Sequence, residues 1–400
     1  MFYGLLTHGK LSCKLPKANN VTCRSLITLR SLSSSAITSR GSHYTPRALK
    51  PKKSSQPSVI MHALKASLSS GPAKQLDNAS YQPRSQDYWY ADTDGTWQPN
   101  STLQPSSLSR QGRPMDPKTI RLISWNIDVL VGFAKERMRA ALLYLDQVIA
   151  AAPAETAVVV FLQEMGQSDL VQIREAAWVK NRFNITELDN RNWLGPFYGT
   201  TTLVDQRLTI KNVFRVPWVS KFDRDGLFVD IALTNTQSSA ETGKVLRLCN
   251  THLESLVADP PVRPLQLATA SKILKEDIVA SALIAGDFNA IQPFDRTLHT
   301  ENDLKDAYLE LGGEEDSDDG FTWGYQVPQW LRDKFGCCRM DKILIRGDVL
   351  PKSFQRIGVD VKVTEEDMEM VQKEIEGGWV TDHYGVMGDF EFTEGWQLQI

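Results

Sequence analysis

The stretch Leu283–Ile291 reads LIAGDFNAI, and it changes character in the middle. Its first half is apolar, as in a strand buried in a core, and it then passes through Gly286 into Asp287 and Asn289. Read alone, the second half would be an ordinary turn, because Asp and Asn are favoured in turns. A core strand does not need an acid and an amide at its end, so the alternative is that these groups do chemistry. Residues two apart in an extended chain project to the same side, which would place Asp287 and Asn289 together.

Four other segments share this pattern of an apolar strand that ends in a polar cluster. They are Ser124–Asp128 (SWNID), Leu162–Glu164 (LQE), Thr251–Ser255 (THLES) and Thr381–Gly385 (TDHYG). A single cluster would be weak, since one Glu after a strand is commonly a cap and one His is commonly structural. Five clusters suggest strand ends that gather at one edge of a sheet, where rigid elements can hold a site.

The residue types in these clusters suit the hydrolysis of a phosphate ester. Glu164 is a hard oxygen ligand of the kind that Mg²⁺ prefers, with Mn²⁺ as the alternative ion. Asp287 is suited to accept a proton from water, and Asn289 to orient that water or a phosphate oxygen. His252 and His383 are suited to donate hydrogen bonds to phosphoryl oxygens as charge develops.

Two further acids accompany this set. Asp382 points away from His383 along an extended chain, so it is interpreted as a metal ligand or as a support for one. Asp341, in the stretch MDKIL, is predicted to hold His383 in the required tautomer, as carboxylates commonly do. The sequence has no Ser-His-Asp signature, no Gly-rich phosphate loop and no CxxC, which argues against acyl transfer, nucleotide-dependent transfer and redox chemistry.

The charge of the chain is unevenly distributed. No Asp or Glu precedes Asp77, and the first 76 residues carry 12 of the 45 Lys and Arg, which leaves 33 basic against 48 acidic residues in the remainder. An acidic body argues against broad capture of nucleic acid, for which a basic face is expected, but leaves room for a small basic pocket. The five cysteines match neither zinc nor disulfide spacing, which indicates free thiols in a reducing compartment. No apolar stretch approaches the roughly 20 residues of a membrane helix.

Composition divides the chain into three parts. Residues 1–50 are rich in Ser, Arg and Lys and contain no acid, as transit peptides do; mitochondrial import is expected, with a nuclear signal at residues 50–53 (KPKK) as the alternative. Residues 51–116 are rich in Ser, Pro and Gln and predict a disordered linker. Its aromatic stretch at residues 88–99 (YWYADTDGTWQP) is expected to dock on the domain, with a partner motif as the alternative. Residues 117–400 form the expected catalytic domain.

Strand and helix patterns interleave over that domain. Apolar residues at helical spacing predict helices over residues 135–152 and 264–280. The stretches 227–236 and 245–255 flank a polar turn and predict a hairpin. Frequent hairpins favour a layered α/β domain with mixed or antiparallel sheets over a pure βαβ repeat.

Taken in order, these motifs resemble the endonuclease/exonuclease/phosphatase superfamily of Mg²⁺-dependent phosphodiesterases. The series WN, QE, THLES, GDxN and DH runs from about Ile120 to Phe392. Within the superfamily, SWNIDVL, THLES with RPLQLATASKIL, FTWGY and RMDKILIRG are most similar to the 5′-tyrosyl-DNA phosphodiesterase branch, which removes tyrosine from 5′-phosphate ends. The resemblance implies a four-layered α/β sandwich of the DNase I type, with two packed mixed or antiparallel sheets and the site at one edge. We expect a nucleic-acid 5′ end, free or protein-linked, as the partner, no membrane, and a monomer.

The resemblance also implies roles residue by residue. Asn126 would contact the phosphate or a metal-bound water, Glu164 would bind Mg²⁺, and Asp382 would lie beside the metal. Asp341 would orient His383, which would stabilise the transition state. Three residues would line the phosphate and the nucleophile: His252, Asp287 and Asn289.

The departures from the branch concern substrate recognition. Ile291 stands where the branch usually has an arginine, two residues after the GDxN asparagine. Three residues are candidates to supply that cation, each with a solvated surface arginine as the alternative: Arg224, Arg263 and Arg339. Trp323 in FTWGY is a further candidate for contact with substrate. Lys342 replaces the branch's arginine after Asp341, which keeps the charge but not the bidentate geometry.

Three functions remain open. The first is hydrolysis of a 5′-phosphotyrosyl DNA bond, as in DNA repair. The second keeps the chemistry but acts on RNA or oligoadenylate, on abasic DNA or on a small phosphoester, and Ile291 and the acidic body favour it. The third is a binding module that has lost catalysis and acts through residues 88–99. Every motif position is filled, which argues against the third.

Overall fold

The structure is a computed structural model that describes residues 81–100, 114–237 and 243–399. The predicted leader at 1–50, and the parts of the predicted linker at 51–80 and 101–113, lie outside the described residues. Among the described residues, no helix is long and apolar enough to cross a membrane.

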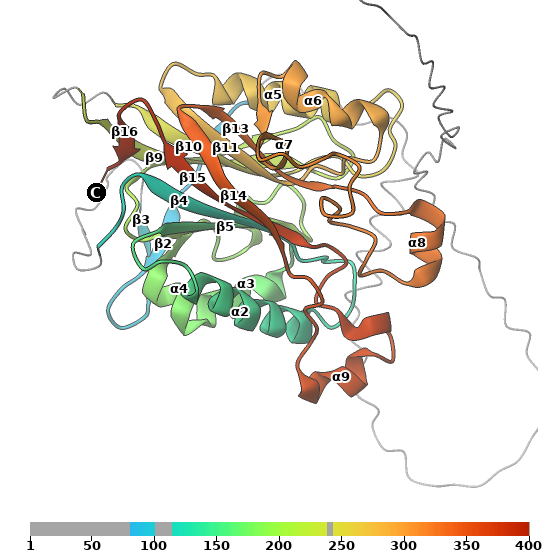
Figure 1. Ribbon diagram of the computed structural model, residues 1–400. Coiled ribbons are helices and arrows are strands. Elements are labelled where there is room, and N and C mark those ends of the chain that lie inside the picture. The colour runs from blue at the N-terminus through green and yellow to red at the C-terminus, as the bar shows by residue number, and fades with distance from the viewer. Residues whose placement is uncertain (1–80, 101–113, 238–242, 400) are drawn as a thin grey trace, which may run out of the picture.

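In the described part of the chain, two sheets of eight strands each pack face to face (Figure 1). The first sheet contains, in spatial order, β14 (Val349–Ile357), β15 (Gly385–Phe392), β4 (Thr119–Asn126), β5 (Ala157–Met165), β7 (Gly199–Asp205), β6 (Phe183–Ile185), β2 (Tyr88–Ala91) and β3 (Trp97–Asn100). The second contains β1 (Arg84–Ser85), β8 (Ile210–Pro217), β9 (Asp225–Asn235), β10 (Val245–His252), β11 (Val279–Asp287), β13 (Asp341–Gly347) and β12 (Lys305–Asp306), with β16 (Trp396–Leu398) paired to β9.

Helices cover the outer faces of both sheets (Figure 1). The first sheet is covered by α2 (Ala134–Ala150), α3 (Gln167–Glu175) and α4 (Ala177–Arg182), and the second by α5 (Arg263–Leu274) and α6 (Leu298–Glu301). Shorter helices lie in the connections: α7 (Ala307–Glu310), α8 (Gln329–Phe335) and α9 (Glu365–Val371). The fold is therefore the four-layered α/β sandwich that the sequence predicted.

Strand alternation divides the apolar side chains between the inner and outer cores. Along β11, Leu283 and Ala285 lie in the core between the sheets, whereas Ala282 and Ile284 lie in the core under α5. Because side chains alternate along a strand, Asp287 lies on the same face of β11 as Leu283 and Ala285. Its side chain is therefore directed into the space between the sheets, at the very end of β11.

A parallel strand pair at the centre of each sheet sets the register of the functional strand ends. In one pair, His252 at the end of β10 lies opposite Asp287 at the end of β11. In the other, Asn126 at the end of β4 lies opposite Gln163 on β5. The two pairs are joined across the sandwich by a hydrogen bond from Gln163 Nε2 to Asn250 Oδ1 of 2.8 Å. Parallel pairs end at the same edge, so both deliver their polar residues to one place.

Gly286 occupies a position that other residues cannot adopt. Its φ is +150°, and a Cβ atom there would lie 1.7 Å from the carbonyl oxygen of Thr251 on β10. Backbone therefore passes too close to this glycine for a side chain to be accommodated.

The N-terminal part of the described chain differs from the prediction. β2 and β3 form a hairpin that pairs with β6, and β1 pairs with β8, so the prediction of a disordered linker is wrong for residues 81–100. The aromatic residues explain this: Tyr88 is buried in the core between the sheets, and Trp97 Nε1 donates to the carbonyl oxygen of Arg174 at 3.0 Å. Docking of the aromatic stretch 88–99 is therefore confirmed.

The predicted hairpin is present as β9 and β10, which pair antiparallel. The predicted helix at 135–152 corresponds to α2, but the one at 264–280 ends earlier, because α5 stops at Leu274 and β11 begins at Val279. Pairing of Val279 with Val245 takes those last residues into the sheet instead of the helix.

Candidate active site

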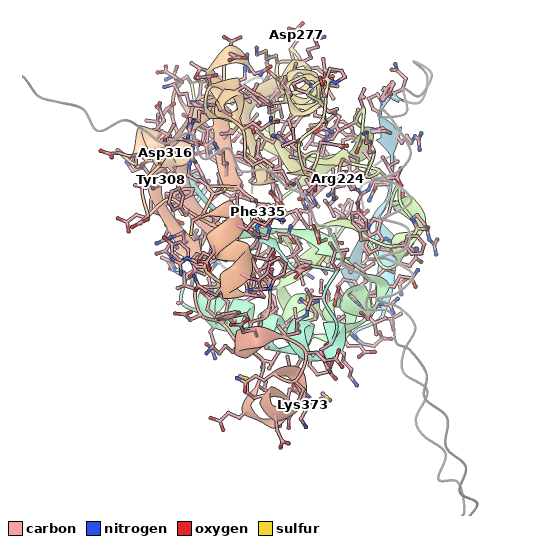
Figure 2. The ribbon with its side chains drawn as sticks, turned by 90° about the vertical axis from the view of Figure 1, so that its right-hand side faces the viewer. Arg224, Asp277, Tyr308, Asp316, Phe335 and Lys373 are labelled. Atoms are coloured by element: carbon pink, nitrogen blue, oxygen red, sulfur yellow. The ribbon has the colours of Figure 1, made fainter. Side chains whose placement is uncertain are left out.

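Polar side chains from strand ends of both sheets meet at one edge of the sandwich. This edge is the right-hand side of Figure 1, and Figure 2 looks onto it, with Arg224 and Phe335 of α8 on the same face. The sequence-predicted residues that come together there, or in direct contact with the group, are Asn126, Glu164, His252, Asp287, Asn289, Asp341, Asp382 and His383.

Asp287 is the centre of this group. Its Oδ2 lies 3.1 Å from Asn126 Nδ2, 3.1 Å from His252 Nε2 and 3.7 Å from His383 Nε2. Its Oδ1 accepts the backbone N–H of Asn289 at 2.8 Å. Burial by itself would raise the pKa of Asp287, but the charge of protonated His383 and the hydrogen bonds from His252 and Asn289 hold that pKa below its ordinary value. Asp287 is therefore an ionised carboxylate surrounded by N–H groups.

Asn289 is placed by its own unusual backbone. Its φ is +47°, and its side-chain Nδ2 donates to the carbonyl oxygen of Leu253 at 3.2 Å. Asp128 and Glu164 also have positive φ, at 56° and 53°. Strained residues that cluster in this way are characteristic of functional sites, because the surrounding structure must hold them there.

His252 is fixed in one tautomer by Arg224. Arg224 Nη1 lies 2.7 Å from His252 Nδ1, and a guanidinium only donates, so Nδ1 must accept and the proton is on Nε2. Burial and the nearby Arg224 charge lower the pKa of His252, which keeps it neutral. Arg224 also donates to Ser255 Oγ at 2.8 Å. These hydrogen bonds orient His252, and contact of Arg224 with substrate stays a prediction, because Arg224 also lines the pocket described below.

Replacing Arg224 should therefore impair the site through the loss of the partner that orients His252. Arg224→Leu should lower kcat by about 10- to 100-fold, as loss of an orienting partner commonly does. Arg224→Gln retains an N–H donor and should lose less. Rates of both variants would be compared at equal folded fraction, measured by circular dichroism; equal rates for the Leu and Gln variants would argue against the orienting role.

His383 is held by Asp341 in the way the sequence predicted. His383 Nδ1 lies 2.8 Å from Asp341 Oδ2, and its Nε2 faces Asp287. Burial disfavours the charged imidazole, but Asp341, Asp287 and Asp382 together raise the pKa of His383 well above its ordinary value. Burial raises the pKa of Asp341 to about 6. The site thus holds one neutral and one protonated histidine, both with an N–H directed at Asp287.

Three carboxylates beside this group repel one another: those of Asp128, Glu164 and Asp382. Burial, then repulsion from Asp382, raises the pKa of Asp128 to about 8, and Glu164 adds to that repulsion. Burial likewise raises the pKa of Asp382. Oxygen-only ligands are what Mg²⁺ prefers, and a cation would relieve this mutual repulsion. Sequence reasoning quoted Asp128 within SWNID but gave it no role; the spacing of two residues from Asn126 was the available signal.

Among the described residues, one group has ligand atoms close enough to share an ion: Asp287, Asp341 and His383, within 4.8 Å of one another. The hydrogen bond between His383 Nδ1 and Asp341 already occupies two of these groups. The assignment of a cation to Asp128, Glu164 and Asp382 stays a prediction, based on their oxygen atoms and their mutual repulsion.

The carboxylate set gives a prediction for Asp128→Asn. An acid whose pKa is raised by folding destabilises the fold when ionised, so the substitution should raise the melting temperature of the metal-free protein at pH 7. It should also reduce the increase in melting temperature that Mg²⁺ produces, because one ligand is weakened. Thermal unfolding with Mg²⁺ and with chelator would measure both effects, and equal Mg²⁺ shifts in the variant and the parent protein would contradict the assignment.

The remaining substrate candidates have other partners. Trp323 is half-buried and donates Nε1 to Asp382 Oδ2 at 2.8 Å, so it orients a site carboxylate. Arg263 is buried and pairs with Asp295 at 2.7 Å. Arg339 is buried and pairs with Asp306 at 2.8 Å and also with Glu315. These buried ion pairs correct the prediction that Arg263 and Arg339 contact substrate, since both guanidinium groups are already neutralised in the fold.

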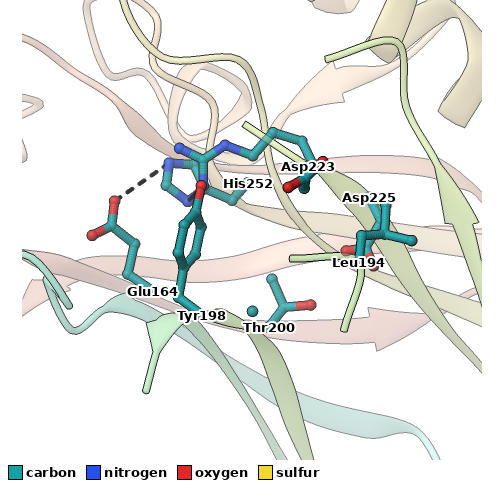
Figure 3. A pocket seen from close by; sticks show the side chains of 9 residues that line it. Glu164, Leu194, Tyr198, Thr200, Asp223, Asp225 and His252 are labelled. Carbon is teal, nitrogen blue, oxygen red and sulfur yellow. Dashed lines mark hydrogen bonds and ion pairs between the residues drawn. The ribbon is translucent and has the colours of Figure 1, made fainter. Parts of the chain in front are cut away.

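A pocket extends the site beyond Glu164 and His252, whose side chains lie 3.8 Å apart at its inner end (Figure 3). Its lining residues are Glu164, Leu194, Tyr198, Gly199, Thr200, Asp223, Arg224, Asp225 and His252. The pocket lies directly beside the reactive groups.

Comparisons with known proteins agree with this fold. A sequence model of the Endonuclease/Exonuclease/phosphatase family matches residues 123–383. Among solved structures, Danio rerio TDP2 in complex with a single-strand DNA product is 20% identical with a TM-score of 0.51, covering 68% of this chain and 99% of that one. Truncated Caenorhabditis elegans TDP2 is 21% identical with a TM-score of 0.50, covering 68% and 97%. Comparison with curated protein sequences gives no significant match. At these identities the structural likeness shows a shared fold.

Proposed function

The chain belongs to the endonuclease/exonuclease/phosphatase family, and from that premise we propose that it is a Mg²⁺-dependent phosphodiesterase. Its proposed substrate is the 5′ end of a nucleic acid, with the 5′-phosphotyrosyl bond of DNA as the bond that is cleaved.

The observation that carries the chemistry is the convergence of three N–H donors on Asp287 beside a set of carboxylates. Asn126, His252 and His383 all direct a side-chain nitrogen at one oxygen of Asp287. This is the donor set that phosphoryl oxygens require. The adjacent carboxylates supply the ligands for a cation. A phosphate ester bound between the N–H donors and the carboxylates would have hydrogen-bond donors on one side and the cation on the other.

The residues of the chain then have distinct roles. Mg²⁺, held by Asp128, Glu164 and Asp382, would supply Lewis-acid stabilisation of charge on the phosphoryl group. Asp287 accepts a hydrogen bond from the attacking water and so directs the oxygen atom of that water at phosphorus. Because the pKa of Asp287 is lowered, its carboxylate stays ionised before the reaction. The attacking water becomes acidic as the new O–P bond forms, and Asp287 then receives the proton of that water. The bond between phosphorus and the leaving oxygen breaks, while Asn126, His252 and protonated His383 donate to the charged phosphoryl oxygens.

Two sets of observations favour different substrates. The motifs SWNIDVL, THLES and FTWGY support a 5′-tyrosyl bond, and one structure of similar fold is of a TDP2 complexed with single-strand DNA product. Ile291 and the ion-paired Arg263 and Arg339 favour the alternative of RNA, abasic DNA or a small phosphoester.

A substrate panel separates these possibilities. The full chain would be incubated in excess with a 5′-phosphotyrosyl oligonucleotide, an abasic duplex, an RNA oligonucleotide and a small aryl phosphodiester, each with Mg²⁺, Mn²⁺ or chelator. We expect rapid release of a 5′-phosphate end from the first substrate only, abolished by chelator. Faster cleavage of another substrate would support the proposed active site but reject the 5′-phosphotyrosyl bond as the substrate. Absence of cleavage and of Mg²⁺ binding by calorimetry would favour a binding module.

We also propose that residues 1–50 are a mitochondrial targeting segment. A fluorescent protein carrying residues 1–50 should accumulate in mitochondria, because an acid-free segment with spaced arginines is suited to import. A fusion of residues 41–60, which carries KPKK, is the matched test for the nucleus. Nuclear accumulation of the second fusion with diffuse signal from the first would overturn mitochondrial import.

A further inference from the structure

The pocket beside Glu164 and His252 is lined by side chains of opposite charge. Arg224 lines the pocket and contacts His252, and Asp223, labelled in Figure 3, also contributes to the lining. A third charged residue of the lining, Asp225, is already neutralised by Arg215 at 2.7 Å. Glu164 belongs to the cation side of the site. The charges that a bound molecule meets in the pocket are therefore those of Arg224 and Asp223.

The inner part of the pocket is rigid and aromatic. The Arg224 guanidinium lies 5.2 Å from the ring centre of Tyr198 and 5.4 Å from that of Phe222. The Tyr198 hydroxyl donates to the carbonyl oxygen of Phe222 at 2.7 Å, which fixes the ring. Arg224 Nε is buried and has no hydrogen-bond partner among the described residues. This end is suited to an aromatic or partly anionic group next to the phosphate.

Asp223 differs from the other acids of the pocket. It is exposed, and within the described residues no hydrogen bond or ion pair engages its carboxylate. Its φ is +53°, a conformation that Asp adopts at some energetic cost. Its carboxylate lies against Gly195, where an added Cβ atom would be 3.4 Å from Oδ2. An unpaired carboxylate at this point places a fixed negative charge where a molecule in the pocket would continue outward.

This charge distribution discriminates between the two halves of a phosphodiester substrate. A polynucleotide in the pocket would bring its next phosphate toward Asp223, and like charges repel. A leaving group with a protonated amine would instead meet an opposite charge. We propose that the pocket receives the leaving group rather than the polynucleotide, and that Asp223 selects a leaving group that carries an ammonium, such as a tyrosyl residue with a free amine. The proposal rests on the phosphodiesterase function proposed above.

The test compares two substrates that differ only in this charge. One oligonucleotide carries tyramine esterified through its phenol to the 5′-phosphate, and the other carries N-acetyltyramine. With the full chain and Mg²⁺, kcat/KM should be about three- to five-fold higher for tyramine, the size that a partly exposed ion pair supports. The preference should shrink at high salt. In Asp223→Asn the ratio should fall to about one. Asn is a suitable replacement because it tolerates positive φ.

Asp319→Asn is the matched control, since Asp319 is also an exposed acid but does not line the pocket. It should keep the preference of the unmodified chain. A ratio of one in the unmodified chain, or a preference that survives Asp223→Asn, would overturn the role of Asp223 and leave the phosphodiesterase function standing. Cleavage of neither substrate, together with cleavage of a different phosphodiester, would overturn the proposed substrate and this inference with it.

Discussion

Asp287→Asn should lower the rate of phosphoester cleavage by about 10²- to 10⁴-fold, the range attributed to a positioned general base. The amide has nearly the same shape as the carboxylate but cannot receive the proton of the attacking water. Its NH₂ group would also face N–H donors of Asn126, His252 and His383, which now converge on one carboxylate oxygen. The loss should fall mainly on kcat, because Asp287 acts on water and not on the substrate.

Single-turnover rates with enzyme in excess would measure this loss without interference from product release. Asp303→Asn is the matched control, because Asp303 is an exposed acid paired only with Lys275 on the surface, and it should retain full activity. Circular dichroism would establish that both variants are folded. An Asp287→Asn rate within ten-fold of the unmodified chain would remove Asp287 from the role of base.

Gly286→Ala should destabilise the whole domain by about 3–5 kcal/mol, which is at the upper end for a single substitution. The added Cβ atom would lie 1.7 Å from the carbonyl oxygen of Thr251, and both are backbone-fixed, so the strands themselves would have to separate. The φ of +150° adds strain for any residue with a side chain. Because β10 and β11 carry His252 and Asp287, the folded fraction that remains should also be poorly active.

Equilibrium unfolding in urea, read by the midpoint at unchanged slope, would measure this effect. Gly132→Ala is the matched control: a Cβ atom there would meet nothing within 4 Å, and its φ lies outside the positive range. Its free energy of unfolding should change by less than about 0.5 kcal/mol. A Gly286→Ala protein as stable as the control would mean that β10 and β11 are not packed as described.

The strand ends could be predicted from sequence because both the strands and their polar ends have local signals. The run LIAG is apolar and GDFN is not, and the same change occurs at SWNID and THLES. Strand alternation then places Asp287 between the sheets without any knowledge of tertiary structure. The sequence could place Asn126, His252 and Asp287, which are the last residues of their own strands. The expected strand ending in TDHYG is wrong, because Asp382 and His383 precede β15.

The partners of the three candidate arginines have no local signal in the sequence. Arg224, Arg263 and Arg339 all looked available, yet one bonds His252 across 28 positions and the other two pair with Asp295 and Asp306. These ion pairs join segments that come together only in the tertiary fold. The strands within residues 81–100 were missed for a related reason: β2 and β3 are short and gain stability from pairing with β6 and from burial of Tyr88, not from their own composition.

The hydrogen bond between Gln163 and Asn250 makes the proposed activity depend on how the two sheets are positioned against each other. Asn126 and Glu164 belong to one sheet, whereas His252 and Asp287 belong to the other, and this bond spans them beneath the site. A slip of one sheet over the other by a fraction of a strand repeat would leave every helix and strand intact and still separate the donors from the carboxylates. On gentle warming, cleavage should therefore fade together with the near-ultraviolet signal of the packed aromatic rings, while the far-ultraviolet signal of the strands persists.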